Sequence, residues 1–387
     1  MKLTGAGSLI RVAFLTGAAG IVLSGIGYLL NAGQFFYSWL TSFAFWVSIG
    51  VGGLFLTILH HLTGSVWSVV LRRLFETAMK VLPLLLLFFI PVALGIHDLY
   101  HWSHGDTVAN DLLLQKKTPY LNVPFFIIRT VIYFTVWFLL GRGLYKNSVS
   151  QDKQHNERYI SNMKRISAPG VILFAITISF AAFDWLMTLD AHWYSTIFGV
   201  YYFAGGTLAV LAFITLLAII FRGRGILANE ITVEHYHDLG KLLFTFTVFW
   251  GYIAFSQYFL IWYANIPEET VWYQHRWVDS WKVVSLLLVF GHFVIPFFTL
   301  MIRANKRNLR LLIPMTVWIL FMHWVDLYWL VLPSLFHHGF HLSWIDLTAF
   351  IGIGGIFVGA FFVQLEKHAL IPVNDPKLEA SVKIKNY

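Results

Sequence analysis

Ten apolar runs, each about 20 residues long, occupy most of this sequence. A helix of that length crosses the hydrocarbon core of a bilayer, which is about 30 Å thick. A segment in lipid must satisfy its own backbone hydrogen bonds, and the runs lack the alternating pattern of an outer-membrane barrel. The sequence therefore predicts an all-α integral membrane protein with about ten transmembrane helices. We expect these helices near residues 9–30, 36–62, 78–96, 121–144, 168–187, 198–221, 242–263, 281–301, 311–332 and 344–363.

The composition supports this fold class. The chain is 58% hydrophobic and only 12% charged, whereas soluble domains average about 25% charged residues. These proportions exclude a soluble enzyme and an intrinsically disordered chain. The loops between the expected spans are short, so we expect residues 1–387 to form one transmembrane domain, with a cytoplasmic tail at residues 367–387.

Lys and Arg are distributed unevenly among the loops. Of the 27 Lys and Arg residues, 22 lie near the N-terminus, in the even-numbered loops or near the C-terminus, and 4 lie in the odd-numbered loops. Because cytoplasmic loops carry the excess of positive charge, this count predicts that both termini are cytoplasmic. The net charge of +8 follows from this bias. It therefore does not indicate a nucleic-acid partner.

The chain contains no cysteine. It therefore cannot ligate a conventional iron–sulfur cluster or attach a c-type haem by itself. A membrane-embedded b-haem needs two histidines that face each other at one depth, and only His292 and His323 are near mid-membrane. We expect no metal site in this chain.

Ionisable residues inside a bilayer are costly and are therefore candidates for function. Most of those found here fall in the half of the membrane that the charge bias places outside. His97 and His101 are four residues apart and would share a helix face, with Asp98 beside them. The candidates for a quinone site or a proton path in this half are His97, Asp98, His101, Arg129, Asp184, Asp190, His192, Gln257, His323 and Asp326.

These candidates indicate an outward-facing site that handles protons. Histidine exchanges protons near neutral pH, and a neighbouring aspartate orients its ring. His60, His61 and His292 could continue a proton path inward. The alternatives are ordinary interfacial histidines in the loops and a structural pair inside the bundle, such as Arg129 with Asp184.

Two clusters of small residues occur inside expected spans, at residues 50–53 and 352–355. Glycines in this arrangement allow two membrane helices to approach closely. A nucleotide-binding loop would need a soluble context, which this chain lacks. We therefore expect both clusters to lie at helix–helix contacts.

Several longer strings resemble one protein family. They are HDLYHW at 97–102, KTPYLNVPFFIIR at 117–129, FDWLMTLDAHWYSTIFGVYYF at 183–203, FWGYIAFSQYFLIWYANIPEE at 249–269 and HWVDLYWLVLP at 323–333. Together they resemble the shorter of the two large membrane subunits of bacterial alternative complex III, often labelled quinone-binding subunit 2. Those subunits are similar to the polysulfide-reductase-type, or NrfD-like, membrane anchors. One departure is Asp190, where the family often has glutamate followed by proline.

The resemblance implies a fold and a set of partners. It implies two four-helix bundles, spans two to five and six to nine, flanked by the first and last spans. It also implies a bacterial inner-membrane complex that oxidises menaquinol or ubiquinol. The implied partners are lipid, a sister NrfD-like subunit, a periplasmic iron–sulfur subunit, and multi-haem and mono-haem c-type cytochromes, which would carry the redox groups.

Three functions follow from these observations. The leading hypothesis is a membrane subunit of a quinol:electron-acceptor oxidoreductase with a quinol or proton-release site in its periplasmic half. The second is a proton-coupled secondary transporter, although such proteins usually break paired helices near the midplane. The third is a purely structural anchor whose intramembrane charges only lock the bundle.

Overall fold

The computed structural model describes residues 2–154, 156–337 and 339–385, and these residues form helices joined by turns and loops. The expected ten spans are confirmed: ten helical segments have the length and hydropathy needed to cross a membrane. One isolated antiparallel bridge joins Lys2 to Ala369. The spans are α1 (Gly7–Leu30), α2 (Ala32–Thr63), α3 to α4 (Arg72–Leu94), α8 (Val123–Lys153), α9 to η3 (Glu157–Leu189), α10 (Phe198–Gly223), α11 (Val233–Ala264), α13 to α14 (Trp281–Met301), α16 to η5 (Leu309–Ser334) and α17 (Trp344–Glu366).

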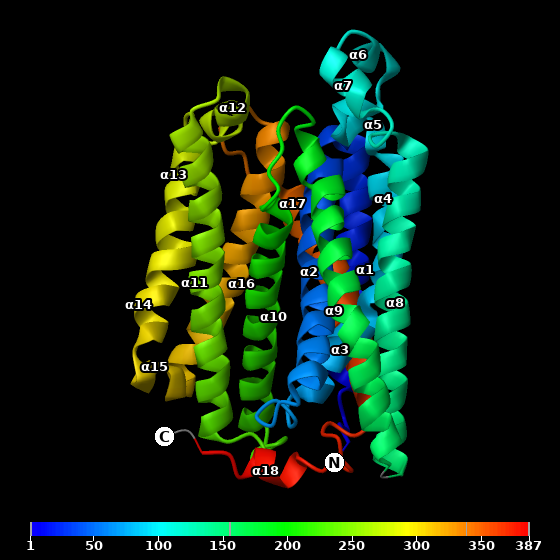
Figure 1. Ribbon diagram of the computed structural model, residues 1–387, viewed down its shortest axis with the longest axis vertical. Coiled ribbons are helices and arrows are strands. Elements are labelled where there is room, and N and C mark those ends of the chain that lie inside the picture. The colour runs from blue at the N-terminus through cyan, green and yellow to red at the C-terminus, as the bar shows by residue number, and fades with distance from the viewer. Residues whose placement is uncertain (1, 155, 338, 386–387) are drawn as a thin grey trace.

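Eight of the spans form two rings of four, seen side by side in Figure 1. In the first ring α2 packs on α3 and α9, and α8 closes the ring between them. In the second ring α10 packs on α11 and α16, and the α13–α14 span closes the ring. Helix α2 also packs against α10 and α16, which joins the two rings. The grouping follows chain order, with spans two to five in one ring and six to nine in the other.

The first and last spans pack along each other through glycine. A Cβ atom placed on Gly20 of α1 would lie 2.6 Å from the backbone nitrogen of Gly352 in α17. At Gly355 it would lie 2.5 Å from the backbone of Gly17. The two backbones are therefore in direct contact, which confirms the expected role of the cluster at residues 352–355. The cluster at residues 50–53 is also at helix contacts, because Gly52 faces the backbone of Gly206.

This contact makes a stability prediction. Replacing Gly20 with leucine should separate α1 from α17, because the added atoms meet backbone that cannot move aside. We expect the free energy of unfolding to fall by about 1–3 kcal/mol. Gly25 lies on the same helix with open space around it. Gly25→Leu should therefore leave the thermal unfolding of the purified chain unchanged. Equal unfolding temperatures for the two variants would contradict the contact.

Two spans are interrupted. The third runs as α3 (Arg72–Leu85), η1 (Leu86–Phe88) and α4 (Phe89–Leu94), with Pro83 inside α3. The eighth runs as α13 (Trp281–Leu287), a π-helical segment η4 (Leu288–Val294) and α14 (Ile295–Met301). Pro296 is the second residue after η4, and its missing N–H removes one rung of the helical hydrogen-bond ladder. Widened π turns of this kind are frequent at functional sites.

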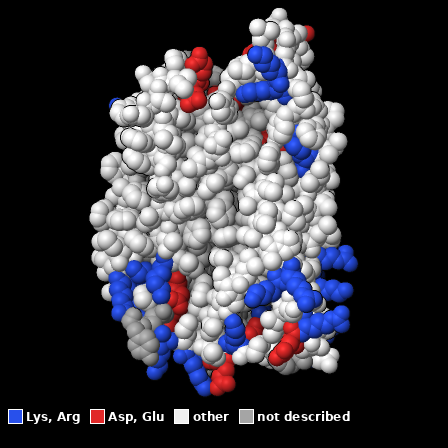
Figure 2. All heavy atoms as spheres, viewed as in Figure 1, with Lys and Arg blue, Asp and Glu red and all other residues white. Residues whose placement is uncertain are grey.

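Short helices cover the two ends of the bundle. Both termini lie at one end, here called the terminal end, with α15 (Arg303–Arg307) and α18 (Leu378–Val382) (Figure 1). The opposite end carries α5 (Ile96–Leu99), η2 (His101–Ser103), α6 (Gly105–Ala109), α7 (Leu112–Lys117) and α12 (Pro267–His275). Lys and Arg gather at the terminal end (Figure 2). The charge bias found along the sequence is thus a bias between the two ends of the folded protein.

Candidate functional site

A cavity of about 840 Å³ lies in the second ring, between α11 and the eighth span and beneath α12. Its volume falls within the range of pockets that hold small organic ligands, about 300–1,000 Å³. Most of its wall is apolar, and the polar side chains are few. They include Tyr201, Gln257, Tyr273 and Arg276.

The cavity reaches the outer surface of the bundle. Three aromatic side chains of α11 that line it are largely exposed: Tyr252 at 63%, Phe255 at 61% and Trp262 at 61%. Val289 of η4 lines the facing wall and is 51% exposed. Because these residues lie on spanning helices, the opening faces the side of the bundle that lipid would surround. An apolar molecule could enter from the membrane.

Gln257 lies on the cavity wall, as a side chain of α11. Its Oε1 accepts a hydrogen bond from the Ser195 hydroxyl at 2.8 Å, and its Nε2 donates to the Tyr273 hydroxyl at 3.1 Å. The amide is therefore fixed between α12 and the segment that precedes α10. Of the outer candidates taken from the sequence, Gln257 is the one that lines the cavity directly.

Arg276 lies at the α12 end of the cavity, and it is one of the four Lys and Arg residues that the sequence places in the odd-numbered loops. Its guanidinium donates to three backbone oxygens, those of Trp329, Trp272 and Leu330, at 2.9–3.1 Å. It also stacks on the Trp272 ring at 3.5 Å. Burial lowers the pKa of Arg276 to about 9, and the charge of Asp190 opposes that fall. The residue is thus a cation at neutral pH, and no described carboxylate forms an ion pair with it.

A buried acid lies directly behind the cavity wall. Asp326 of α16 accepts hydrogen bonds from the Tyr201 hydroxyl through Oδ1 and from the Trp250 indole through Oδ2, the latter at 3.2 Å. Both donors line the cavity. Neither was a candidate from the sequence, because aromatic residues are too abundant in this chain to single out two of them.

Two predicted histidines lie close to this acid. The ring of His292 stacks on Trp250 with centroids 4.0 Å apart, and both of its buried nitrogens lack a protein partner in the described structure. His323, one turn from Asp326 on α16, makes a 2.9 Å hydrogen bond with the Ser48 hydroxyl of α2. Its Nδ1 has no partner among the described residues. His292, assigned to an inward path, and His323 therefore belong to one buried polar cluster with Asp326.

Arg129 and Asp184 form the pair that the sequence suggested as a structural alternative. The guanidinium binds both carboxylate oxygens, at 2.8 and 2.9 Å. The hydroxyls of Tyr120 and Tyr133 donate to the same two oxygens at 2.9 and 2.6 Å. Four donors thus occupy a fully buried carboxylate in the first ring.

This pair should stabilise the fold only while it is complete. Asp184→Ala leaves the Arg129 guanidinium buried and unpaired, and we expect a loss of about 3–5 kcal/mol in the free energy of unfolding. Replacing both residues with leucine should cost clearly less, because no charge then remains buried. Thermal unfolding of the purified single and double variants measures the coupling. Strictly additive effects would be inconsistent with the pair.

The remaining outer candidates lie in the short helices and turns at the end opposite the termini. The expected shared face of His97 and His101 is wrong, because α5 ends at Leu99 and Tyr100 is extended. His97 instead contacts His104, with ring centroids 5.4 Å apart. Asp98 and His101 are also exposed.

Asp190 and His192 lie in the segment before α10. Asp190 is half-buried near Arg276. His192 is exposed and pairs with Asp111 at 2.5 Å, and this hydrogen bond lowers the pKa of Asp111. These contacts place His192 in a surface pair away from the cavity lining.

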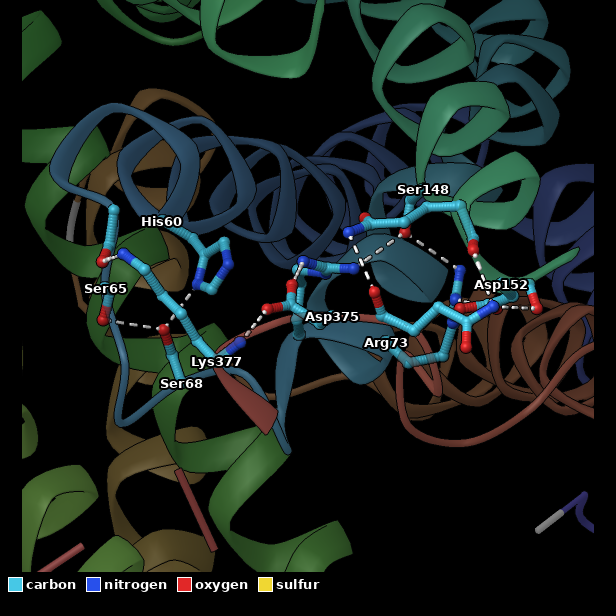
Figure 3. Close-up of polar contacts among 12 residues, drawn as sticks. His60, Ser65, Ser68, Arg73, Ser148, Asp152, Asp375 and Lys377 are labelled. Atoms are coloured by element: carbon cyan, nitrogen blue, oxygen red, sulfur yellow. Dashed lines mark hydrogen bonds and ion pairs between the residues drawn. The ribbon is translucent and has the colours of Figure 1, made fainter. Parts of the chain in front are cut away.

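A second buried polar network lies at the terminal end of the first ring (Figure 3). Arg72 and Arg73 both pair with Glu76, at 3.1 and 2.8 Å, and all three are buried. Arg73 also pairs with Asp152 of α8 at 2.5 Å. The sequence prediction started the third span at residue 78, because these charges resemble a loop. Since they neutralise one another, they form the first turns of α3 instead.

The predicted inner histidines lie at the same end. His60 of α2 makes a 2.7 Å hydrogen bond with the Ser68 hydroxyl (Figure 3). His61 is buried, and its Nε2 has no partner among the described residues. Neither residue lines the cavity, so a proton path through them remains a prediction.

The chain after the last span packs across this end of the first ring. Asp375 pairs with Arg72 at 2.5 Å, and Lys377 donates to the carbonyl oxygen of Gly64 (Figure 3). The side chain of Asn374 donates to the backbone of Gln151 and of Asp152. The expected tail is therefore a docked segment over its described residues.

Docking of this segment can be tested with two acidic residues. Asp375→Ala removes an acceptor from a buried arginine, so the free energy of unfolding should fall by about 1.5–3 kcal/mol. Glu379 belongs to the same segment but pairs with Lys383 in the open. Glu379→Ala should leave the unfolding temperature unchanged. A similar shift for both variants would mean that Asp375 contributes no specific contact.

Comparison of the chain with protein-family models and with curated proteins finds no match. Within the described residues, no group of three or more His, Asp or Glu side chains is arranged to hold a metal ion. The function is therefore argued from the cavity, its lining and the acid behind it.

Proposed function

We propose that this chain is a membrane subunit of a bacterial respiratory quinol:electron-acceptor oxidoreductase of the alternative complex III type, and that its cavity binds the quinol. The observation that carries the proposal is the form of the cavity. It opens laterally on spanning helices, its walls are apolar and aromatic, and a few fixed polar groups lie at one end with a buried acid behind them. Partner subunits would hold the iron–sulfur clusters and c-type haems.

A quinol fits the chemistry of this cavity. Its head is a flat ring with two opposed oxygens, which aromatic walls and hydrogen-bonding groups can orient. The Tyr273 hydroxyl and the Gln257 amide are placed near the α12 end, together with the cationic Arg276. The isoprenoid tail would leave through the exposed aromatic mouth. A lateral opening suits a substrate that is dissolved in lipid.

The charge bias supports an orientation. Lys and Arg gather at the terminal end, which favours a cytoplasmic location for that end. The cavity and α12 would then lie in the periplasmic half of the bacterial inner membrane. That placement suits electron transfer to periplasmic partners.

The pair of Arg129 and Asp184 in the first ring has a different role. Four hydrogen-bond donors already occupy the Asp184 carboxylate, which supports a structural role for this pair.

The cavity gives a direct binding test. Ala254 lines the cavity, so Ala254→Phe should fill part of it and weaken binding of decylubiquinone and menaquinone-4 by at least about tenfold, or 1.4 kcal/mol. Binding to the chain in lipid nanodiscs can be followed by quenching of tryptophan fluorescence, because Trp250 lines the site. Ala175→Phe, on the exposed face of α9, is the matched control and should bind as the wild type does.

Two results would contradict the proposal. One is the absence of saturable quinone binding to the wild-type chain. The other is a colourless, iron-free preparation when the chain is purified gently from its native membrane, because the proposed partners carry c-type haem and iron in excess of haem.

A further inference from the structure

The two rings each contain a buried aspartate that accepts a hydrogen bond from a tyrosine hydroxyl. In the first ring Asp184 accepts hydrogen bonds from the hydroxyls of Tyr120 and Tyr133, and Arg129 neutralises its charge. In the second ring Asp326 accepts hydrogen bonds from the hydroxyl of Tyr201 and from the indole N–H of Trp250. No described cation pairs with Asp326, although its side chain is buried. The two sites thus differ in the group that balances the carboxylate.

The other buried acids have their charge compensated. Glu76 pairs with Arg72 and Arg73, and Asp238 pairs with Lys241. Asp346 lies in the first turn of α17, where it accepts the backbone N–H of Ser343 at 2.8 Å. A helix N-terminus stabilises a negative charge. Asp326 has neither form of compensation, and a buried carboxylate without a cation loses its unfavourable charge when it takes up one proton.

Tyr201 connects the cavity with this acid. Its side chain lines the cavity, and its hydroxyl donates to Asp326 Oδ1. A hydroxyl can accept one proton and pass on another, whereas the indole N–H of Trp250 only donates. Trp250 therefore fixes the carboxylate, and Tyr201 offers the route by which a proton can leave the cavity.

We propose that Asp326 is the acceptor of the proton released by the ligand in the cavity, and that Tyr201 transfers it; this assignment rests on the proposed function. As one electron passes from the quinol to a one-electron carrier of a partner subunit, an O–H bond of the quinol breaks and its proton binds to the Tyr201 oxygen. The original Tyr201 proton moves to Asp326. The products are a neutral semiquinone, an unchanged tyrosine and a carboxylic acid.

The groups around Asp326 suit this exchange. His323 lies one turn away on α16, and His292 of η4 stacks on the far partner, Trp250. From α10 and the α12 end, the charged or titratable neighbours of Tyr201 are Tyr273 and Arg276. Because neither histidine forms an ion pair with Asp326 in the described structure, its proton is not fixed by a permanent charge.

Turnover of the intact complex, purified through a tag on this chain, tests the assignment. Loss of a general base typically costs 10²–10⁴-fold in rate, so Asp326→Asn should lower kcat for decylubiquinol oxidation by about 100-fold with little change in KM. Tyr201→Phe should have a similar but smaller effect, and Asp326→Glu should recover part of the loss. Asp184→Asn should keep kcat per assembled complex while lowering the unfolding temperature.

The pH profile separates a proton acceptor from a structural residue. The acceptor must be ionised, so wild-type kcat should rise with pH through the titration of Asp326. Asp326→Asn should lose that rise. In infrared spectra of the chain alone, a titrating carboxylic acid band should vanish in Asp326→Asn and persist in Asp184→Asn.

Each contrary result has a distinct meaning. Three results would overturn the assignment of Asp326: an unchanged kcat in Asp326→Asn, an unchanged pH profile in that variant, or a titrating band that survives the change. In each case, quinone binding by the wild-type chain would still support the proposed function. Failure of the wild-type chain to bind decylubiquinone would overturn both. Retained binding in Asp326→Asn is expected, because Tyr201 and Gln257 still line the cavity.

Discussion

Inside a bilayer, a protein must find partners for its own polar groups, because the hydrocarbon core supplies no water. The buried carboxylates of this chain meet that demand in different ways. Arginine neutralises Asp184 and Glu76, and the first turn of α17 holds Asp346. Asp326 has only neutral donors, a phenol and an indole. The three compensated carboxylates hold helices together. Asp326 is the buried carboxylate that we propose can gain and lose a proton.

The two rings meet this demand differently. The second ring contains the π-helical segment η4, the unpartnered nitrogens of His292 and the lateral cavity. The first ring has its charges saturated by Arg72, Arg73 and Arg129. Ion pairs thus join helices of the first ring, whereas the second ring contains the cavity and the buried Asp326. Function is therefore best sought in the second ring.

The sequence was informative where a property depends on a whole segment. Length and hydropathy located all ten spans, and the pairing of Arg129 with Asp184 was foreseen as an alternative. It was uninformative where one residue decides the outcome. The helix ends before Tyr100, which is extended, so His97 and His101 do not share a helix face. The local sequence pattern does not predict this helix end.

Some residues of the cavity could not be predicted from the sequence, because their residue type is abundant or because their burial depends on distant segments. Tyr201 and Trp250 are two of 33 Tyr and Trp residues, and only tertiary packing selects them. Arg276 follows a short helix, so its burial depends on the carbonyl groups of α16, which are distant in sequence. The charged first turns of α3 look exposed until their partners on α8 and after α17 are in place.

The glycine contact between α1 and α17 has a consequence for how the protein is made. The ribosome makes α1 before α17, so α1 enters the membrane before its glycine partner exists. During that interval its glycine face has no partner from its own chain and is open to other small-residue helices. The contact between α1 and α17 therefore forms only after the eight intervening spans have been made.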